Sequence, residues 1–123
     1  NNQEWAAFLQ TRKDGDYSIA RNGWIADYND PCSFLDMWYT DGGNNDAQYS
    51  NPDYDAAIDA AKATSDPEER MKAFHEAEDI LIGQDSVLAP IYFYTQPYML
   101  NPDIDGMYYT PLGYFFFGYT SKK

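Results

Sequence analysis

Apolar residues recur at helical spacing in three parts of the chain. Their spacing of three and four residues predicts helices over residues 3–13, 51–64 and 66–83. A stripe of this kind covers one side of each helix, so all three helices should pack against a common core. The residues that form the stripes are Trp5, Phe8 and Leu9, then Tyr54, Ala57, Ile58 and Ala61, then Met71, Phe74, Ala77 and Leu81.

Three helix starts share one local signal, a polar residue followed by proline. The pairs are Asn51-Pro52, Asp66-Pro67 and Asp30-Pro31. The first residue can cap a helix, and the proline lacks an amide hydrogen that the first turn does not need. Glu69 follows Asp66 at capping-box spacing. After Asp30-Pro31 we expect a helix of about two turns, whose inner residues are Phe34, Leu35 and Trp38.

Alternating or β-rich runs predict strands in three other places. Residues 17–25 follow a period of two without a polar face, which is typical of a strand covered on both sides. Residues 87–95 are rich in β-formers, and Pro90 places them at a sheet edge or a bulge. Residues 114–119 form a third strand, followed by an exposed tail. The predicted fold class is therefore α/β, with helices packed on a mixed sheet.

Two irregular segments complete the pattern. Residues 40–50 are polar and without periodicity, which indicates a functional loop. Residues 101–106 match the first half of a calcium-binding loop. Leu112 occupies the position where that motif needs a bidentate glutamate, so a simple turn is the better interpretation.

Composition limits the classes of partner. The formal net charge is −12, from 20 acidic and 8 basic residues, which argues against nucleic acid or an anionic membrane. The apolar runs are shorter than the roughly 20 residues of a membrane span. The absence of an initiator methionine indicates a fragment of a longer protein.

The sequence favours binding over catalysis, with no cofactor and no metal. Cys32 is the single cysteine, so it is either a small buried residue or the partner of a cysteine outside the chain. His75 has no second histidine or cysteine at ligand spacing. Phosphate-binding, dinucleotide-binding and nucleophile-elbow motifs are absent from the sequence. Pairs of carboxylates are common in so acidic a chain and do not by themselves indicate acid–base chemistry.

One stretch combines groups that suit a ligand. Trp24 and Asp27 lie at the predicted end of the first strand, and Tyr92 and Tyr94 share one face of the second. A carboxylate beside aromatic rings can hold an ammonium group through a charge-assisted hydrogen bond and cation–π contact. The alternative is that Arg21 and Asp27 form surface ion pairs while Trp24 fills the core.

One specific motif, Gly-Trp-x-Ala-Asp-Tyr-x-x-Pro, stands within a longer set of residues that together form a family pattern. The set is Arg21 to Pro31, Phe34-Leu35, Asn44-Asn45, Tyr49, Asn51-Pro52-x-Tyr54-Asp55, Arg70, Ala77-Glu78, Leu81 and Pro90 to Tyr94. With these residues, nearly the whole chain resembles the C-terminal part of the oligopeptide-binding proteins, the extracytoplasmic substrate-binding subunits of peptide ABC transporters. Ile25 stands where some members have cysteine, and Cys32 is not at that position, so a disulfide to the rest of the protein is not assumed from the resemblance.

The resemblance implies a role for each of five residues. Asp27 would pair with the α-ammonium group of a peptide, and Trp24 would line a side-chain pocket. Arg21 would meet the C-terminal carboxylate of some peptides, while Tyr94 and Asn44 would lie near the ligand. The implied function is peptide capture outside a bacterial membrane for import by permease subunits. Another solute, such as an oligosaccharide or a metal–peptide chelate, is the alternative within this architecture, and a carbohydrate-active enzyme or lectin module is the alternative outside it.

The resemblance also implies a division of the chain between two lobes of a periplasmic-binding-protein-like fold. Residues 1–95 would belong to the second, ligand-binding lobe, and residues 96–123 would return across the hinge to the first. The aromatic run of Phe115, Phe116 and Phe117 would then be covered by a sheet of the first lobe. Left uncovered, this run could pair two copies of the fragment in a homodimer.

Overall fold

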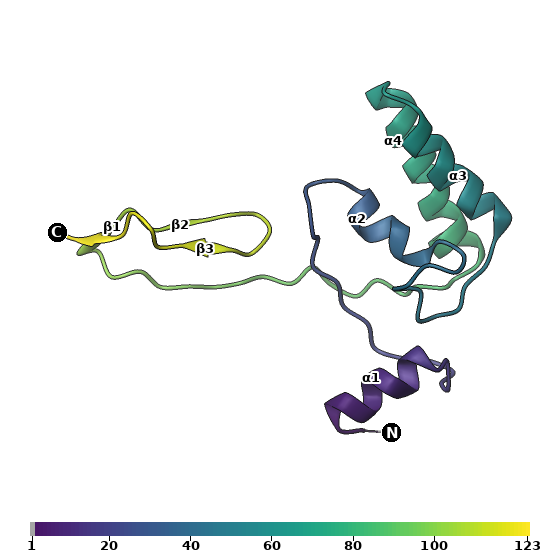
Figure 1. Cartoon of the computed structure of the whole chain (residues 1–123), viewed down its shortest axis with the longest axis horizontal. Helices are drawn as coiled ribbons and strands as arrows, with labels where there is room; N and C mark the ends of the chain where they lie inside the picture. The colour runs from purple at the N-terminus through teal and green to yellow at the C-terminus, as the bar shows by residue number, and fades with distance from the viewer. Residues whose placement is uncertain (1) are drawn as a thin grey trace.

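The computed structural model describes residues 2–123. Figure 1 shows a helical body, a first helix that lies apart from it, and a long arm that ends at the C-terminus. The helices are α1 (Trp5–Lys13), α2 (Cys32–Leu35), η1 (Asp36–Trp38), α3 (Pro52–Ala63), α4 (Pro67–Glu78) and the π-helical turn η2 (Asp79–Gln84). The strands are β1 (Ile104–Asp105), β2 (Tyr108–Tyr109), β3 (Phe115–Phe116) and β4 (Ser121–Lys122).

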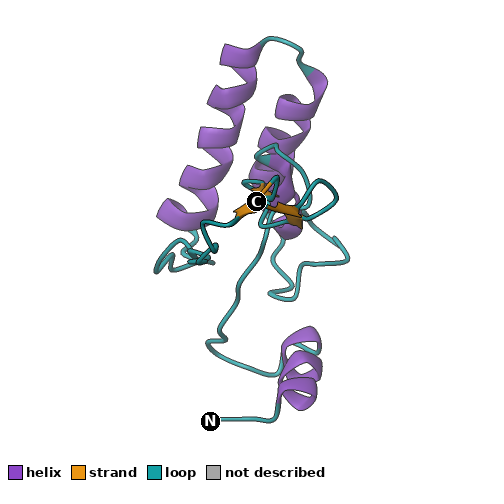
Figure 2. Ribbon diagram, turned by 90° about the vertical axis from the view of Figure 1, so that its left-hand side faces the viewer, coloured by secondary structure: helices purple, strands orange, loops and turns teal. Residues whose placement is uncertain are grey.

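The core lies between the α3–α4 hairpin and the short helices α2 and η1. Figure 2 shows α3 and α4 running side by side, joined by a short loop at one end. Tyr54 and Ile58 of α3, Phe74 of α4 and Leu81 of η2 are its largest fully buried side chains. Leu35, Met37 and Trp38 complete the core from α2 and η1. The apolar stripes of the second and third predicted helices therefore face each other, as their spacing indicates, except for Met71, which is 44% exposed.

The predicted caps form at both long helices. The Asn51 side chain accepts a hydrogen bond from the Asp53 amide at 2.9 Å, and Asp66 accepts from the amides of Glu68 and Glu69 at 2.9 and 3.0 Å. The reciprocal half of the capping box is different from the prediction. The Glu69 carboxylate accepts from the Thr64 hydroxyl, and that hydroxyl in turn accepts from the Asp66 amide.

Two of the predicted strands do not form within residues 2–123. Residues 17–25 and 87–95 carry no strand assignment, and the mixed sheet that they were expected to build is replaced by two separate two-stranded antiparallel sheets in the arm. The physical reason is that a strand needs a hydrogen-bonded neighbour, and period-two spacing does not supply one. Ile19, Ile25 and Phe93 are 95%, 74% and 98% exposed as a result.

Part of the predicted burial is also wrong. Phe34 was expected on the inner side of its helix, but it is 47% exposed, while Met37 is buried instead because η1 turns more tightly than an α-helix. Helix α1 buries none of its residues, and Trp5 remains 58% exposed. Cys32 is buried, as expected for a small apolar residue.

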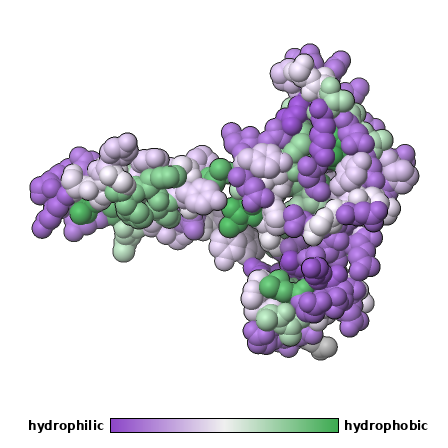
Figure 3. Space-filling view, viewed as in Figure 1, coloured by the Kyte–Doolittle hydropathy of each residue, from purple (hydrophilic) through white to green (hydrophobic). Residues whose placement is uncertain are grey.

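The arm consists of two short antiparallel ladders. Strand β1 pairs with β4 and β2 pairs with β3, so the C-terminal tail, which is exposed as expected, also contains a strand. The rings of Tyr108 and Phe116 stack across the second ladder with centroids 4.8 Å apart. Figure 3 shows apolar side chains gathered along the arm, whereas the visible face of the helical body is largely hydrophilic.

None of the helices described in residues 2–123 is both long and apolar enough to cross a membrane.

Candidate functional site

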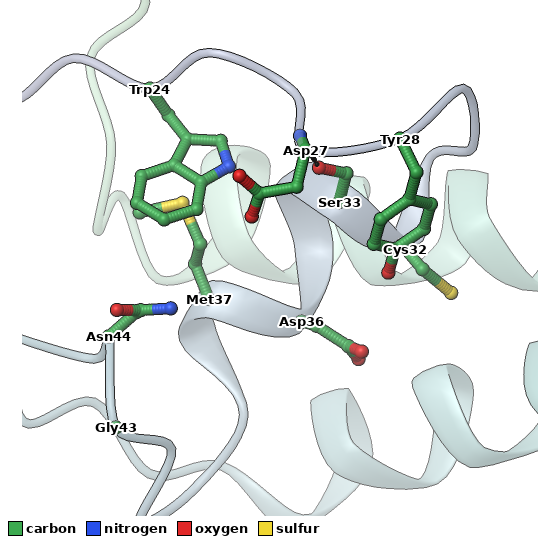
Figure 4. A pocket seen from close by; sticks show the side chains of 9 residues that line it. All are labelled: Trp24, Asp27, Tyr28, Cys32, Ser33, Asp36, Met37, Gly43 and Asn44. Atoms are coloured by element: carbon green, nitrogen blue, oxygen red, sulfur yellow. Dashed lines mark hydrogen bonds between the residues drawn. The ribbon is translucent and has the colours of Figure 1, made fainter.

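An open pocket of about 180 Å³ lies where the Trp24 stretch meets the short helices and the loop of residues 40–50. Figure 4 shows Trp24 and Asp27 from one stretch arranged around the same space as Met37 of η1 and Asn44 of the loop. The lining residues are Trp24, Asp27, Tyr28, Cys32, Ser33, Asp36, Met37, Gly43 and Asn44. The pocket therefore brings together three of the five predicted site residues.

Trp24 forms the apolar wall of the pocket. Its half-buried side chain packs against the hydrophobic core, which fixes the plane of the ring. In Figure 4 the indole nitrogen edge faces the Asp27 carboxylate group. This Nε1 atom is buried and has no hydrogen-bond partner among the described residues. The wall thus offers a flat apolar face with one polar donor at its edge.

Asp27 supplies a negative charge to the pocket, and its main chain is held in place by a hydrogen bond to Ser33. The Asp27 amide donates a hydrogen bond of 2.7 Å to the hydroxyl oxygen of Ser33. Ser33 is only 5% exposed and is the one buried polar residue among those described. Asp27 itself is exposed, so its carboxylate is open to solvent and to a ligand while its main chain is anchored.

Asp30 lies two residues before the first residue of helix α2 and forms an ion pair with Arg70 of α4. Its carboxylate accepts hydrogen bonds from the Cys32 amide at 2.9 Å and from both terminal nitrogens of Arg70 at 2.7 and 2.8 Å. The hydrogen bond from Arg70 lowers the pKa of Asp30 to about 2. The same contact raises the pKa of Arg70. The Asp30 carboxylate thus accepts from the first amide of α2, although the residue directly before this helix is Pro31, and it also connects the pocket segment to the α3–α4 hairpin.

The loop that carries Asn44 is fixed at both of its ends. Asn45 donates from its side-chain amide to the carbonyl oxygens of Tyr39 and Tyr49 at 3.1 and 2.7 Å. Tyr49 and Asn51 both donate to the Asp85 carboxylate, at 2.6 and 2.7 Å. The donation from Tyr49 lowers the pKa of Asp85. These contacts hold the loop of residues 40–50 against the end of η2.

Two predicted site residues lie away from the pocket. Arg21 is exposed and precedes Trp24 in a segment without regular structure. Tyr94 is 78% exposed in the extended connector, where its ring lies 5.5 Å from that of Tyr92. Within the described residues the two tyrosines share a face as predicted, but they do not lie on a strand that neighbours Trp24.

Sequence reasoning missed two residues that support the site. Ser33 was not singled out, since a serine inside a short helix gives no local signal of its role. Arg70 was noted only as part of the resemblance, because the residue that it contacts lies 40 positions earlier in the chain. The sequence offers only a weak signal, because Arg70 shares a mainly acidic helix with a second cation, Lys72.

The pocket suits a cation or a small polar ligand. It brings the carboxylates of Asp27 and Asp36 together with the Trp24 indole and the Asn44 amide. Among residues 2–123, no group of three or more histidine, cysteine or acidic side chains is placed to hold a metal ion. The calcium-like motif forms a turn, in which the Asp103 amide donates to the Asn101 side chain at 2.9 Å.

Curated relatives agree on the kind of protein that contains this segment. The periplasmic oligopeptide-binding protein OppA of Haemophilus influenzae is 41% identical over 105 residues, which are 85% of this chain and 19% of that protein. The chain is homologous to a segment of the oligopeptide-binding proteins. The oligopeptide-binding protein OppA of Bacillus subtilis is 34% identical over 108 residues, which are 87% of the chain and 20% of that protein. No family model matches the chain.

Solved structures give the same answer for the fold. The H. influenzae OppA complex with the peptide RPPGFSPFR superposes with a TM-score of 0.76 at 40% identity, over 86% of this chain and 20% of that one. The open, unliganded murein tripeptide-binding protein MppA also gives 0.76, at 32% identity over 86% of this chain and 20% of its own. The α/β fold class of a periplasmic-binding-protein-like fragment is thus confirmed. The chain spans about one fifth of the length of the relatives it matches.

Proposed function

We propose that the protein carrying this segment is the substrate-binding subunit of an ABC importer and captures oligopeptides outside the membrane. Asp27 pairs with the α-ammonium group of the peptide, and Trp24 lines the pocket of an adjacent side chain. The observation that carries this proposal is the exposed Asp27 carboxylate beside the indole, on a backbone anchored by Ser33. Such a carboxylate has its main-chain geometry set before the ligand arrives, which reduces the entropy cost of binding.

The other assignments rest on the same proposal. Asn44 donates or accepts a hydrogen bond at the opposite side of the pocket, where Figure 4 places its amide. Arg21 and Tyr94 contact more distant parts of the peptide once further segments of the protein surround them. The partners are a peptide and the membrane permease subunits of the transporter, and the location is extracytoplasmic.

The named relatives do not favour the alternatives. OppA of H. influenzae and OppA of B. subtilis are described as oligopeptide-binding proteins, not as enzymes or lectins. An oligosaccharide would also leave the Asp27 charge without an opposite charge to bind. The named relatives give no support to a homodimer through residues 115–117, and within the chain Phe115 and Phe116 pair with β2 along one edge.

Isothermal titration of the full-length protein with alanine tripeptides and pentapeptides tests the role of Asp27. Peptides with a free N-terminus should bind at least tenfold more tightly than the acetylated peptides, which corresponds to about 1.4 kcal/mol. Asp27→Asn should remove this preference, because it deletes the charge and keeps the shape. Asp16→Asn, at an exposed carboxylate outside the pocket, is the matched control and should keep the preference. Equal affinity of the unaltered protein for free and acetylated peptides would refute the proposal.

We also propose that residues 1–95 belong to the ligand-binding lobe and residues 96–123 to the other lobe. What supports this division is the shape in Figure 1, in which a long extended connector separates the helical body from the arm. Closure of two lobes around a ligand changes the distance between them. Fluorophores on cysteines introduced at Lys72 and Tyr119, both exposed, should therefore report a changed separation when peptide is added. A separation that peptide leaves unchanged would contradict the division.

A further inference from the structure

Arg70 occupies a junction of three segments. Its two terminal nitrogens donate to the Asp30 carboxylate, and one of them also lies 3.7 Å from the Cys32 sulfur. Its Nε donates to the Ala61 carbonyl at 3.2 Å, in the last turn of α3, where carbonyl groups lack helical partners. The guanidinium carbon lies 4.7 Å from the centre of the Phe74 ring. All the directional contacts of this side chain are therefore used to join α3, α4 and the start of α2.

A short series of hydrogen bonds leads from Arg70 to the pocket. Arg70 fixes the Asp30 carboxylate, and the Asp30 carbonyl accepts from the Ser33 amide at 3.0 Å. Ser33 then accepts from the Asp27 amide at 2.7 Å through its buried hydroxyl. The Asp30 amide closes the turn by donating to the Tyr28 carbonyl at 2.9 Å. The main chain from residue 27 to residue 33 is thus a hydrogen-bonded turn, and Arg70 is its connection to the helical hairpin.

We infer that Arg70 is a positioning residue for ligand binding, which acts through Asp30 and Ser33 to hold the Asp27 carboxylate at the pocket. This inference rests on the proposed function of Asp27. A planar guanidinium can hold both carboxylate oxygens at once and so fixes direction as well as distance. A lysine at the same place supplies the charge but only a single point of contact.

A structural ion pair and a positioning residue predict different outcomes for Arg70→Lys. A purely structural role lowers the melting temperature and weakens all peptides equally. A positioning role selectively weakens ligands that use the Asp27 charge. The Asp27 carboxylate is still present in Arg70→Lys, but its direction toward the ligand is no longer fixed. Arg12 provides a matched control, because its ion pair with Asp46 at 2.8 Å has similar exposure and does not contact residues 27–33.

The test uses the full-length protein with alanine tripeptides that are free or acetylated at the N-terminus. Arg70→Lys should reduce the preference for the free peptide by threefold or more and should speed hydrogen exchange of the Asp27 amide by about tenfold. Arg12→Lys should leave both quantities unchanged. An unchanged preference and unchanged exchange in Arg70→Lys, with only a lower melting temperature, would overturn the inference.

A second variant covers the case in which Arg70→Lys does not fold. Asp30→Asn keeps an oxygen that can cap α2 and loses the bidentate ion pair, so it should show the same two effects. If the unaltered protein itself has no preference for the free peptide, the proposed function of Asp27 fails. Exchange of the Asp27 amide would still decide whether Arg70 fixes this turn, so the two failures are distinguishable.

Discussion

The ion pair between Asp30 and Arg70 should make the protein sensitive to acid. The hydrogen bond from Arg70 lowers the pKa of Asp30 from 3.8 to about 2. Because the pKa is lower in the folded chain than in the unfolded chain, the contact stabilises the fold fully above pH ~4. This stabilisation decreases as the pH falls through the pKa of the folded state, so the sensitive window lies between about pH 4 and about pH 2.

The size of the effect follows from the pKa difference. Each unit of pKa corresponds to 1.36 kcal/mol, so a decrease of nearly two units gives roughly 2 kcal/mol. The Asp30 side chain is 26% exposed, and solvent screening reduces the expected value to about 1–2 kcal/mol. Asp30→Asn should therefore lower the free energy of unfolding at pH 7 by that amount. Any effect of the substitution that does not depend on pH adds to this value as a constant.

Denaturant titrations of the original protein and of Asp30→Asn at several pH values between 7 and 2 measure this difference. It should decrease toward its pH-independent remainder as the pH approaches 2. Arg70→Gln in the presence of Asp30 should flatten the acid dependence in the same way, because it removes the first cause of the low pKa. A difference between the original protein and Asp30→Asn that is equal at pH 7 and at pH 2.5 would refute the reasoning.

Two further substitutions test the packing of the body and of the arm. Tyr54→Phe removes a fully buried hydroxyl that donates to the Leu35 carbonyl, so we expect a loss of about 1–3 kcal/mol in chemical denaturation; a loss below 0.3 kcal/mol would exclude an important role for this bond. Gly106→Ala places a Cβ 2.0 Å from the Tyr119 carbonyl oxygen at a φ of +78°, so exchange protection of β1 and β4 should be lost. Gly118→Ala meets nothing within 4 Å and should keep that protection; equal effects of the two alanine variants would contradict this assignment.

The helices could be predicted because their signals are local. Asn51-Pro52 and Asp66-Pro67 place a cap and a proline next to each other, and each cap accepts its hydrogen bonds from amides within three residues. The strands at residues 17–25 and 87–95 could not be predicted reliably for the opposite reason. Their sequence favours extended backbone, but pairing depends on neighbours elsewhere, and none of the described segments pairs with them.

The residues of the candidate site also differ in whether a local pattern could predict them. Trp24 and Asp27 lie three residues apart, so one short stretch was enough to indicate that they act together. Asn44 came only from the resemblance, since a polar loop does not reveal which residue faces a pocket. Arg70 acts through Asp30 across 40 positions of sequence, and a contact of that length has no local pattern that could predict it.

The α3–α4 hairpin has a consequence for the order in which the chain folds. Its two helices are joined by three residues, Thr64 to Asp66. Tyr54 and Ile58 of α3 and Phe74 of α4 are buried in the core that the two helices share. Closing so short a loop costs little entropy, so this pair can form before any distant segment arrives. We expect the hairpin to act as the nucleus, on which the turn of residues 27–33 assembles late. The binding pocket would then be among the last features to form and the first to open when the protein unfolds.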